Sequence, residues 1–182
     1  SKKIIYFNKI TKLGKWKNNS HGLDLFELKN KKIGIFGLGK IGLYFAKLCK
    51  SFDMNVYYHD LVRKKKYEKK YGFKYLSKNA LLKNCEIFSL HLHLNNKTIN
   101  YLNSKNMNII KRGSIIINVS RAQLIEQNAL IRFLKNGKIG ALGIDAHYLE
   151  PTKKNDALLS LPSVVCTPHT AGSTKDTYER VI

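Results

Sequence analysis

The sequence predicts an α/β fold built on a doubly wound parallel sheet. Short apolar runs alternate with segments of helical periodicity, as in strands that are joined by crossover helices. Most of the apolar runs are continuous rather than alternating, which is typical of strands buried on both faces of a parallel sheet. A glycine-rich stretch, GLGKIG at 37–42, follows the first run and precedes the first long helix.

Six apolar runs are expected to form the strands of this sheet. In chain order they are KIGIF (32–36), NVYYH (55–59), EIFSLHL (86–92), SIIINV (114–119), ALGIDA (141–146) and SVVCT (163–167).

Two of the intervening segments carry apolar stripes at helical spacing. The first is expected to bury Ile41, Phe45, Leu48, Cys49 and Phe52. The second places Leu130, Phe133 and Leu134 on one face and ends at Gly137, a residue that commonly terminates helices.

The composition indicates a globular protein, since 43% of the 182 residues are hydrophobic. No apolar run approaches the roughly 18 residues that a membrane helix needs, so no membrane partner is expected. The cysteines Cys49, Cys85 and Cys166 stand far apart, each in or beside an apolar segment. We therefore expect buried free thiols in a reducing compartment.

The formal net charge of +21 raises the alternative of a basic nucleic-acid binder. Only five of the 33 basic residues are arginine, however, and lysine, asparagine and isoleucine share codons rich in A and T. A biased genome accounts for this composition, so we expect no nucleic-acid partner. The cluster RKKKYEKK at 63–70 is interpreted as a solvated helix face.

The glycine-rich stretch has the context of a dinucleotide-binding loop, because a strand precedes it and a helix follows it. Gly37 is expected to permit the tight turn, Gly39 the approach of a pyrophosphate, and Gly42 close packing. The helix begins near Lys40 and Ile41, where free N–H groups and a partial positive charge face the phosphates.

Asp60 ends the second predicted strand and is expected to accept hydrogen bonds from the adenosine ribose hydroxyls. Its charge would repel a 2′-phosphate, which favours NAD over NADP. Arg63 and Lys64 follow closely in the sequence and weaken that preference. The alternative is a glycine turn with an aspartate that caps a helix.

Five motifs in this order resemble the NAD-binding domain of the D-isomer-specific 2-hydroxyacid dehydrogenases: GLGKIG, SLHLHL, INVSRA, GIDAHYLEP and TPHTAG. The resemblance implies a Rossmann-type domain over 31–182. The opening segment, 1–30, carries little periodicity and is expected to be a surface connector from an upstream lobe. The substrate-binding lobe would be absent from this chain. It also implies a cytoplasmic homodimer that interconverts a D-2-hydroxy acid and its 2-oxo acid with NAD, as phosphoglycerate dehydrogenase and glyoxylate/hydroxypyruvate reductase do.

The resemblance further assigns roles to four residues. Arg121 matches the arginine that grips the substrate carboxylate, for which a guanidinium fork is suited. His169 matches the catalytic histidine, which takes the hydroxyl proton in oxidation and returns it in reduction. Glu150 matches the glutamate that orients this histidine and favours its charged form. Asp145 matches the acid near the nicotinamide carboxamide.

The same resemblance places further residues beside the cofactor. With Arg121, Asp145 and His169 they are Val119, Ser120, Ala171 and Gly172. Taken singly, Arg121 is interpreted equally well as a surface charge. The alternatives for Glu150 and His169 are a loop acid and a helix-capping histidine.

The sequence departs from the family pattern at several positions. Ala122 stands where glycine is usual, so a positive φ there would be costly. His93 replaces a proline, and His147 with Tyr148 replaces a phenylalanine–acid pair. His91 and His93 share a face of the predicted strand, but no cysteine or acid at matching spacing completes a metal site, so none is expected.

Two further alternatives remain within this fold. One is a binding module like the C-terminal-binding-protein co-repressors, which use NAD to control assembly. The other is a formate- or phosphite-type dehydrogenase, although formate enzymes usually carry glutamine where Glu150 stands.

Overall fold

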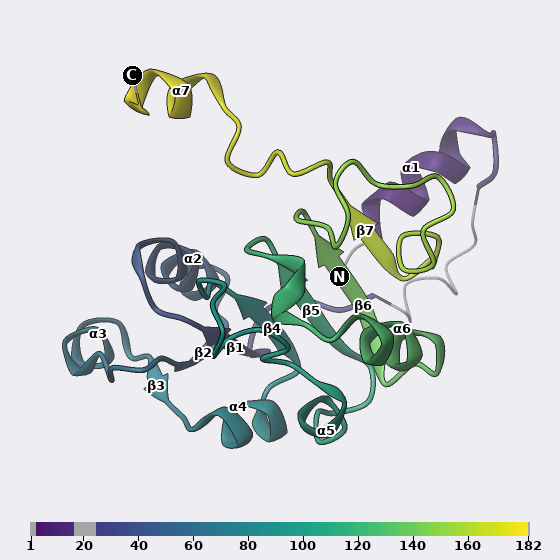
Figure 1. Ribbon diagram of the computed structural model, residues 1–182. Coiled ribbons are helices and arrows are strands. Elements are labelled where there is room, and N and C mark those ends of the chain that lie inside the picture. The colour runs from purple at the N-terminus through teal and green to yellow at the C-terminus, as the bar shows by residue number, and fades with distance from the viewer. Residues whose placement is uncertain (1–2, 17–24, 182) are drawn as a thin grey trace.

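The structure is a computed structural model that describes residues 3–16 and 25–181 (Figure 1). Its centre is a seven-stranded sheet in the order β3-β2-β1-β4-β5-β6-β7, in which every neighbouring pair is parallel. This topology confirms the predicted doubly wound α/β fold. The strands are β1 (Lys32–Phe36), β2 (Asn55–His59), β3 (Lys74–Tyr75), β4 (Ile87–Leu90), β5 (Ser114–Asn118), β6 (Ile139–Ile144) and β7 (Val164–Cys166).

Helices connect the strands and cover the two faces of the sheet. They are α1 (Ile4–Lys12), α2 (Lys40–Ser51), α3 (Lys65–Tyr71), α4 (Lys78–Asn84), α5 (Ser104–Met107), the 3-10 turn η2 (Ala122–Leu124), α6 (Gln127–Lys135) and α7 (Lys175–Val181). Figure 1 shows α2 on one side of the central strands and α4 and α5 on the other. No described residue of α1 is buried, and α7 stands apart from the sheet after an extended segment (Figure 1).

Two apolar cores fill the space between the sheet and its helices. Alternation along β1 divides them: Ile33 and Ile35 belong to the core under α2, whereas Phe36 belongs to the core under α4 and α6. Gly34 also faces α4, where a β-carbon would lie 2.9 Å from Cγ of Leu81. The strand is therefore buried on both sides, as its continuous apolar character predicts.

The strand predictions are correct in existence and approximate in their ends. The first two are confirmed at both ends, and β7 is one residue shorter at each end than predicted. β4 ends at Leu90, so His91 and His93 lie in the following loop and the prediction that they share a strand face is wrong. β6 begins at Ile139 and ends before Asp145. The two-residue β3 was not predicted.

The buried face of α2 differs from the predicted stripe. Gly42, Ala46 and Cys49 face the sheet, whereas Ile41 is 72% exposed and Phe52 is 58% exposed. Leu48 is also exposed and Phe45 is only partly buried. The reason is steric, because a helix that begins at a tight glycine turn lies too close to the sheet for large side chains. By contrast, the α6 stripe of Leu130, Phe133 and Leu134 is confirmed as buried, and α6 ends before Gly137.

The cysteines are free thiols, but they are not all buried. Burial raises the pKa of Cys49 to about 11 and that of Cys85 to about 12. Cys166 is exposed, which contradicts the expectation for that residue. It lies on β7, the edge strand of the sheet, which has a neighbour on one side only.

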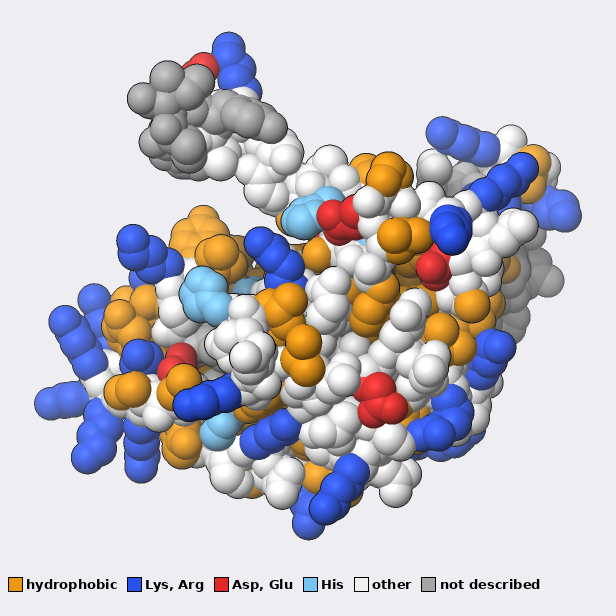
Figure 2. Space-filling view, viewed as in Figure 1, with side chains coloured by type: hydrophobic (Ala, Val, Ile, Leu, Met, Phe, Trp, Pro, Cys, Tyr) orange, Lys and Arg blue, Asp and Glu red, His pale blue; other side chains and the backbone are white. Residues whose placement is uncertain are grey.

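Lysine and arginine side chains are spread over the surface, with a group over α3 at the left of Figure 2. This helix has no buried residue, in keeping with a solvated face. Among the described helices, none is both long and apolar enough to cross a membrane.

A polar cluster ties the loop after β2 to α3. The buried hydroxyl of Tyr58 donates to Oε1 of Glu68 at 2.7 Å and accepts from the backbone N–H of Lys64 at 2.7 Å. Arg63 donates to both Glu68 oxygens, each at 2.8 Å. These bonds, first from Arg63 and then from Tyr58, lower the pKa of the Glu68 carboxyl to about 2.

We predict that Gly42→Ala destabilises the fold although alanine is the better helix former. Helix propensity favours alanine by about 1 kcal/mol. A β-carbon at this position, however, would collide with the carbonyl oxygen of Gly37, a backbone atom that cannot rotate away. Overpacking of this kind costs about 1–3 kcal/mol, so steric repulsion outweighs propensity. The free energy of unfolding, measured by urea titration, should fall by up to about 2 kcal/mol, which is the overpacking cost less the gain in propensity.

The matched control for this prediction is Gly39→Ala. A β-carbon on Gly39 would meet nothing within 4 Å, and its φ of −74° suits any residue. Its unfolding free energy should stay within about 1 kcal/mol of the wild-type value, the scale of changing a helix-capping residue. A greater loss for Gly39→Ala than for Gly42→Ala would contradict this account of the loop.

We also predict a pH-dependent contribution of Glu68 to stability. Its pKa in the folded chain, about 2, lies below the ordinary 4.5. A lowered carboxyl pKa stabilises the fold above the ordinary value, and that contribution is lost as the pH falls from 4.5 toward 2. Glu68→Gln should therefore be less stable than wild type at pH 7, and the difference should shrink below pH 4.5.

Urea titrations at pH 7, 5 and 3.5 measure this difference. Glu86→Gln is the control, because Glu86 meets Lys31 only at 3.8 Å. It should show a smaller difference at pH 7. A Glu68→Gln difference that is constant with pH would show that the carboxylate charge is not involved.

Candidate functional site

The residues singled out in the sequence lie at one edge of the sheet, where the parallel strands end. The glycine loop follows β1, Asp60 follows β2, and residues 119–121 follow β5. Residues 145–150 follow β6, and 167–172 follow β7. From β2 to β6 is four strand spacings, or about 19 Å. A single ligand that touches both ends of this row must therefore be extended, as a dinucleotide is.

The glycine loop has the predicted turn. Gly37 has a φ of +89°, and a β-carbon there would lie 2.6 Å from the carbonyl oxygen of His91. Gly39 opens onto free space, which leaves room for a ligand beside the backbone. Lys40 and Ile41 form the exposed first turn of α2, whose leading N–H groups have no acceptor within the helix.

Asp60 is fixed against the glycine loop. One carboxylate oxygen accepts from the N–H of Leu38 at 2.7 Å, and the other accepts from the N–H of Val62 at 3.2 Å. The side chain thus joins the end of β2 to the loop after β1. A carboxylate oxygen accepts more than one hydrogen bond, so Asp60 keeps capacity for a ligand hydroxyl.

The turn after β5 is shaped by Asn118, which the sequence analysis missed. Asn118 is fully buried, accepts from the N–H of Ser120 at 3.1 Å and donates to the carbonyl of Arg121 at 2.9 Å. The Ser120 hydroxyl donates to the carbonyl of Leu90 at 2.8 Å. Arg121 and Val119 are left exposed at the edge. An asparagine that ends a buried apolar strand is the signal that could have identified this role.

Asp145 holds the segment that follows β7. It is 2% exposed, and its oxygens accept from the N–H of Thr170 and of Ala171, each at 3.0 Å. The Thr167 hydroxyl adds a short third bond. Burial alone would raise the pKa of the Asp145 carboxyl, but these three bonds outweigh burial and lower it. The Asp145 carboxylate therefore binds the segment that follows β7. The contribution of Thr167 was not predicted from the sequence.

The structure brings Glu150 and His169 together. Nδ1 of His169 lies 2.9 Å from each Glu150 oxygen, and the two side chains are 44% and 41% exposed. The backbone N–H of His147 donates to Glu150 at 2.8 Å. This bond, and then the one with His169, lowers the pKa of the Glu150 carboxyl. His169 has a φ of +56°, an uncommon conformation that is concentrated at functional sites.

The departures from the family pattern fit without strain. Ala122 is buried in η2 and does not have a positive φ, so the expected cost of replacing glycine is absent. His147 directs Nε2 to the carbonyl of Thr167 at 2.8 Å, and the Tyr148 hydroxyl donates to the carbonyl of Ile125 at 2.6 Å. Both therefore support the loops around the site.

His91 lies beneath the glycine loop and is bound to the Ser89 hydroxyl at 2.9 Å. Burial lowers its pKa to about 4, so the ring is neutral near pH 7. Within residues 3–16 and 25–181, no three histidine, cysteine or acidic side chains are placed to hold a metal ion together.

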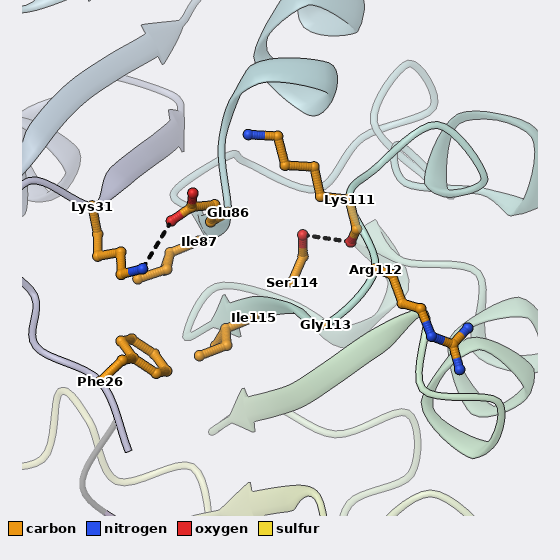
Figure 3. Close-up of a pocket in the computed structure, with 9 residues that line it drawn as sticks. All are labelled: Phe26, Lys31, Glu86, Ile87, Lys111, Arg112, Gly113, Ser114 and Ile115. Carbon is orange, nitrogen blue, oxygen red and sulfur yellow. Dashed lines mark hydrogen bonds and ion pairs between the residues drawn. The ribbon is translucent and has the colours of Figure 1, made fainter. Parts of the chain in front are cut away.

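A pocket of about 300 Å³ lies at the opposite edge of the sheet (Figure 3). Lys31 precedes β1, Glu86 precedes β4 and Ser114 begins β5, so this pocket faces the amino ends of the strands. Ligands of doubly wound sheets bind at the carboxyl ends. The cations beside the pocket already have protein partners: Lys31 has Glu86, Lys111 the carbonyl of Asn84, and Arg112 the carbonyl of Asn136.

The residues at the carboxyl edge fit a dinucleotide. Gly39 leaves an open space beside the leading N–H groups of α2, and Asp60 is held next to it by Leu38. A pyrophosphate needs such an approach to a helix N-terminus, and an adenosine ribose needs such an acceptor.

Comparison with known proteins supports this interpretation of the edge. Residues 1–171 match the family described as "D-isomer specific 2-hydroxyacid dehydrogenase, NAD binding domain". The chain is 31% identical to a glyoxylate reductase of Korarchaeum cryptofilum, over all of this chain and 55% of that protein. It is 32% identical to a D-3-phosphoglycerate dehydrogenase of Archaeoglobus fulgidus, over 97% of this chain and 33% of that protein.

A solved structure shows the same fold. The TT0316 protein from Thermus thermophilus superposes with a TM-score of 0.89 at 30% identity, over 98% of this chain and 56% of that one. The chain thus spans about half the length of these relatives, or less. NAD(H) is the cofactor for which the matched domain is described. From the sheet topology, the glycine loop and the family match together, the chain belongs to the D-isomer-specific 2-hydroxyacid dehydrogenase family, as its NAD-binding domain.

Proposed function

We propose that the protein carrying this chain interconverts a D-2-hydroxy acid and its 2-oxo acid with NAD(H). The observation that carries the proposal is the Glu150–His169 pair, held by Asp145 at the same sheet edge as the glycine loop. A dinucleotide on that loop and an acid–base histidine further along the edge are the two components that a hydroxy-acid dehydrogenase needs.

His169 is the proposed acid–base residue. Nδ1 faces Glu150, so Nε2 is the ring nitrogen that exchanges a proton with the substrate oxygen. The neutral ring takes the hydroxyl proton in oxidation, and the charged ring donates it to the ketone in reduction. Glu150 orients the ring and compensates its charge. Bound NAD supplies the hydride acceptor for oxidation, and NADH the donor for reduction.

Arg121 is the proposed carboxylate-binding residue. It follows β5, two strands from β1, with an exposed side chain that reaches the same edge as the glycine loop. Nη1 donates to the carbonyl of Ser120 at 2.7 Å, which leaves other guanidinium N–H groups for a substrate carboxylate. A two-point grip on that carboxylate would orient the reacting carbon.

The cofactor contacts are proposed along the whole edge. Asp60 accepts from the ribose, and the glycine loop with Lys40 and Ile41 takes the pyrophosphate. The nicotinamide end is proposed to lie beside Val119, Ser120, Arg121, Asp145, His169, Ala171 and Gly172. A substrate lobe supplied by further chain is part of the same proposal, since the relatives are about twice as long or longer. Homodimeric assembly and a cytoplasmic location are proposed from the family resemblance.

A screen of 2-oxo acids tests the proposal. The full-length protein is mixed with NADH and, in turn, glyoxylate, hydroxypyruvate, 3-phosphohydroxypyruvate, pyruvate and phenylpyruvate, and loss of absorbance at 340 nm is followed. Turnover of at least one acid is expected, and its D-hydroxy product should reduce NAD in the reverse assay. NADH binding with no turnover of any oxo acid would favour an NAD-controlled binding module, and formate oxidation would favour the formate-type alternative.

We predict that substitutions of His169, Arg121 and Glu150 change different kinetic properties of the full-length protein. His169→Ala should lower kcat by about two to four orders of magnitude, because proton transfer is lost in the transition state. Arg121→Ala should raise KM and lower kcat/KM, because the carboxylate is gripped in the ground state too. Initial rates against substrate concentration separate these outcomes.

Glu150→Gln should retain part of the activity, since the amide oxygen can still accept from Nδ1. Loss of the carboxylate charge favours the neutral imidazole. The high-pH limit of ketone reduction and the low-pH limit of oxidation should therefore both move to lower pH. Unchanged limits in both directions would show that Glu150 only supports the loop.

A further inference from the structure

The loop after β2 carries two residues of opposite charge that affect the choice between NAD and NADP. In dinucleotide-binding folds an acid at the end of β2 favours NAD, whereas an arginine nearby accommodates the 2′-phosphate of NADP. This chain has both: Asp60, and Arg63 three residues later. Three Cα–Cα steps separate them, so their Cα atoms are at most about 11 Å apart. In the sequence Asp60 favours NAD, and the nearby Arg63 weakens that preference.

The structure shows where the guanidinium is held. Nε and Nη2 of Arg63 each donate to Glu68 on α3 at 2.8 Å, in a bidentate pair. The guanidinium carbon also lies 5.6 Å from the ring centroid of Tyr75, on β3. Two contacts thus direct Arg63 toward α3 and β3.

Glu68 is itself anchored, which distinguishes this pair from an ordinary surface ion pair. Its side chain is only 17% exposed, and Oε1 accepts from the hydroxyl of the fully buried Tyr58 at 2.7 Å. Tyr58 also accepts from the N–H of Lys64, so it fixes both α3 and the loop that carries Arg63. The Glu68 carboxylate is therefore preorganised to bind the Arg63 guanidinium.

We propose that Glu68 is a specificity-determining residue, which enforces NAD preference by holding Arg63 away from the position that a 2′-phosphate would occupy. Asp60 repels the 2′-phosphate, and Glu68 keeps Arg63, the cation best suited to bind that phosphate, in an ion pair. The two act on the same discrimination by independent means. This inference rests on the proposed cofactor-binding role of Asp60 and the glycine loop.

Glu68→Gln is the variant that releases Arg63 with the least damage. The amide oxygen of glutamine can still accept the hydrogen bond from Tyr58. The amide NH₂, however, would face Nη2 of Arg63, which now donates to Oε2 of Glu68. The ionic pairing and the bidentate geometry are both lost. Glu68→Ala removes the contact altogether and is the second variant. Thermal unfolding of each, without cofactor, establishes that it is folded.

The experiment measures the Kd of NADH and of NADPH by calorimetry for the full-length protein. The variants are Glu68→Gln, Asp60→Ala and Arg63→Gln, each alone and in pairs, and Glu68→Ala alone. Asp60→Ala alone should narrow the NADH–NADPH gap. Glu68→Gln should tighten NADPH binding about two- to fivefold, because the freed partner, Arg63, is 53% exposed and its pairing is of the strength found near the surface. It should do so in the presence and in the absence of Asp60, and leave NADH within about twofold.

The decisive measurement combines Glu68→Gln with Arg63→Gln. If Arg63 is the residue that Glu68 restrains, Arg63→Gln should abolish the NADPH gain of Glu68→Gln. Lys64→Gln is the matched control and should leave the gain intact. A gain that persists without Arg63, or no gain in any folded Glu68 variant, would overturn the inference. Failure of the wild-type protein to bind NADH at all would instead contradict the proposed function.

Discussion

The buried carboxylate of Asp145 is the contact on which the candidate catalytic geometry depends. Asp145 directly follows β6 and accepts from Thr167, Thr170 and Ala171, which follow β7, and these residues surround His169 in the sequence. Each bond joins groups more than 20 residues apart, so the carboxylate fixes the loop relative to the sheet rather than to itself. A charge that is 2% exposed is tolerated only because three donors compensate its lost hydration.

The parallel sheet imposes the second constraint. All strands end at the same edge, so the loops after β1, β2, β5, β6 and β7 meet there without further design. The glycine turn brings α2 close to the sheet, and the residues of α2 that are buried there are the small Gly42, Ala46 and Cys49. The same closeness places the N-terminus of α2 at the edge, where its free N–H groups point out of the fold. The proposed cofactor site is thus a consequence of how the first strand passes into its helix.

Sequence patterns predicted the features that depend on neighbouring residues in the chain, such as the strands. The strands over 32–36 and 55–59 were correct to the residue, because the turn residues Gly37 and Asp60 follow them directly. The predicted buried face of α2 was correct at Cys49 and wrong at Ile41, Leu48 and Phe52, because the face that packs closest to the sheet carries small residues. Asn118, Thr167 and the Tyr58–Glu68–Arg63 cluster were missed because their partners are set by the fold. Pairing of Glu150 with His169 was expected only through family resemblance, and the structure supplies the distance.

The two halves of the proposed site differ in how firmly the chain holds them. Asp60 is fixed by backbone donors, and the glycine loop by packing, so the cofactor half is preorganised within this domain. Glu150 and His169 are nearly half exposed, and water screens an ion pair at such positions. Their 2.9 Å contact gains strength when water is excluded, as happens when a cleft closes over substrate. On the proposed function, the domain binds cofactor by its own structure, while the strength of its acid–base pair depends on what covers it.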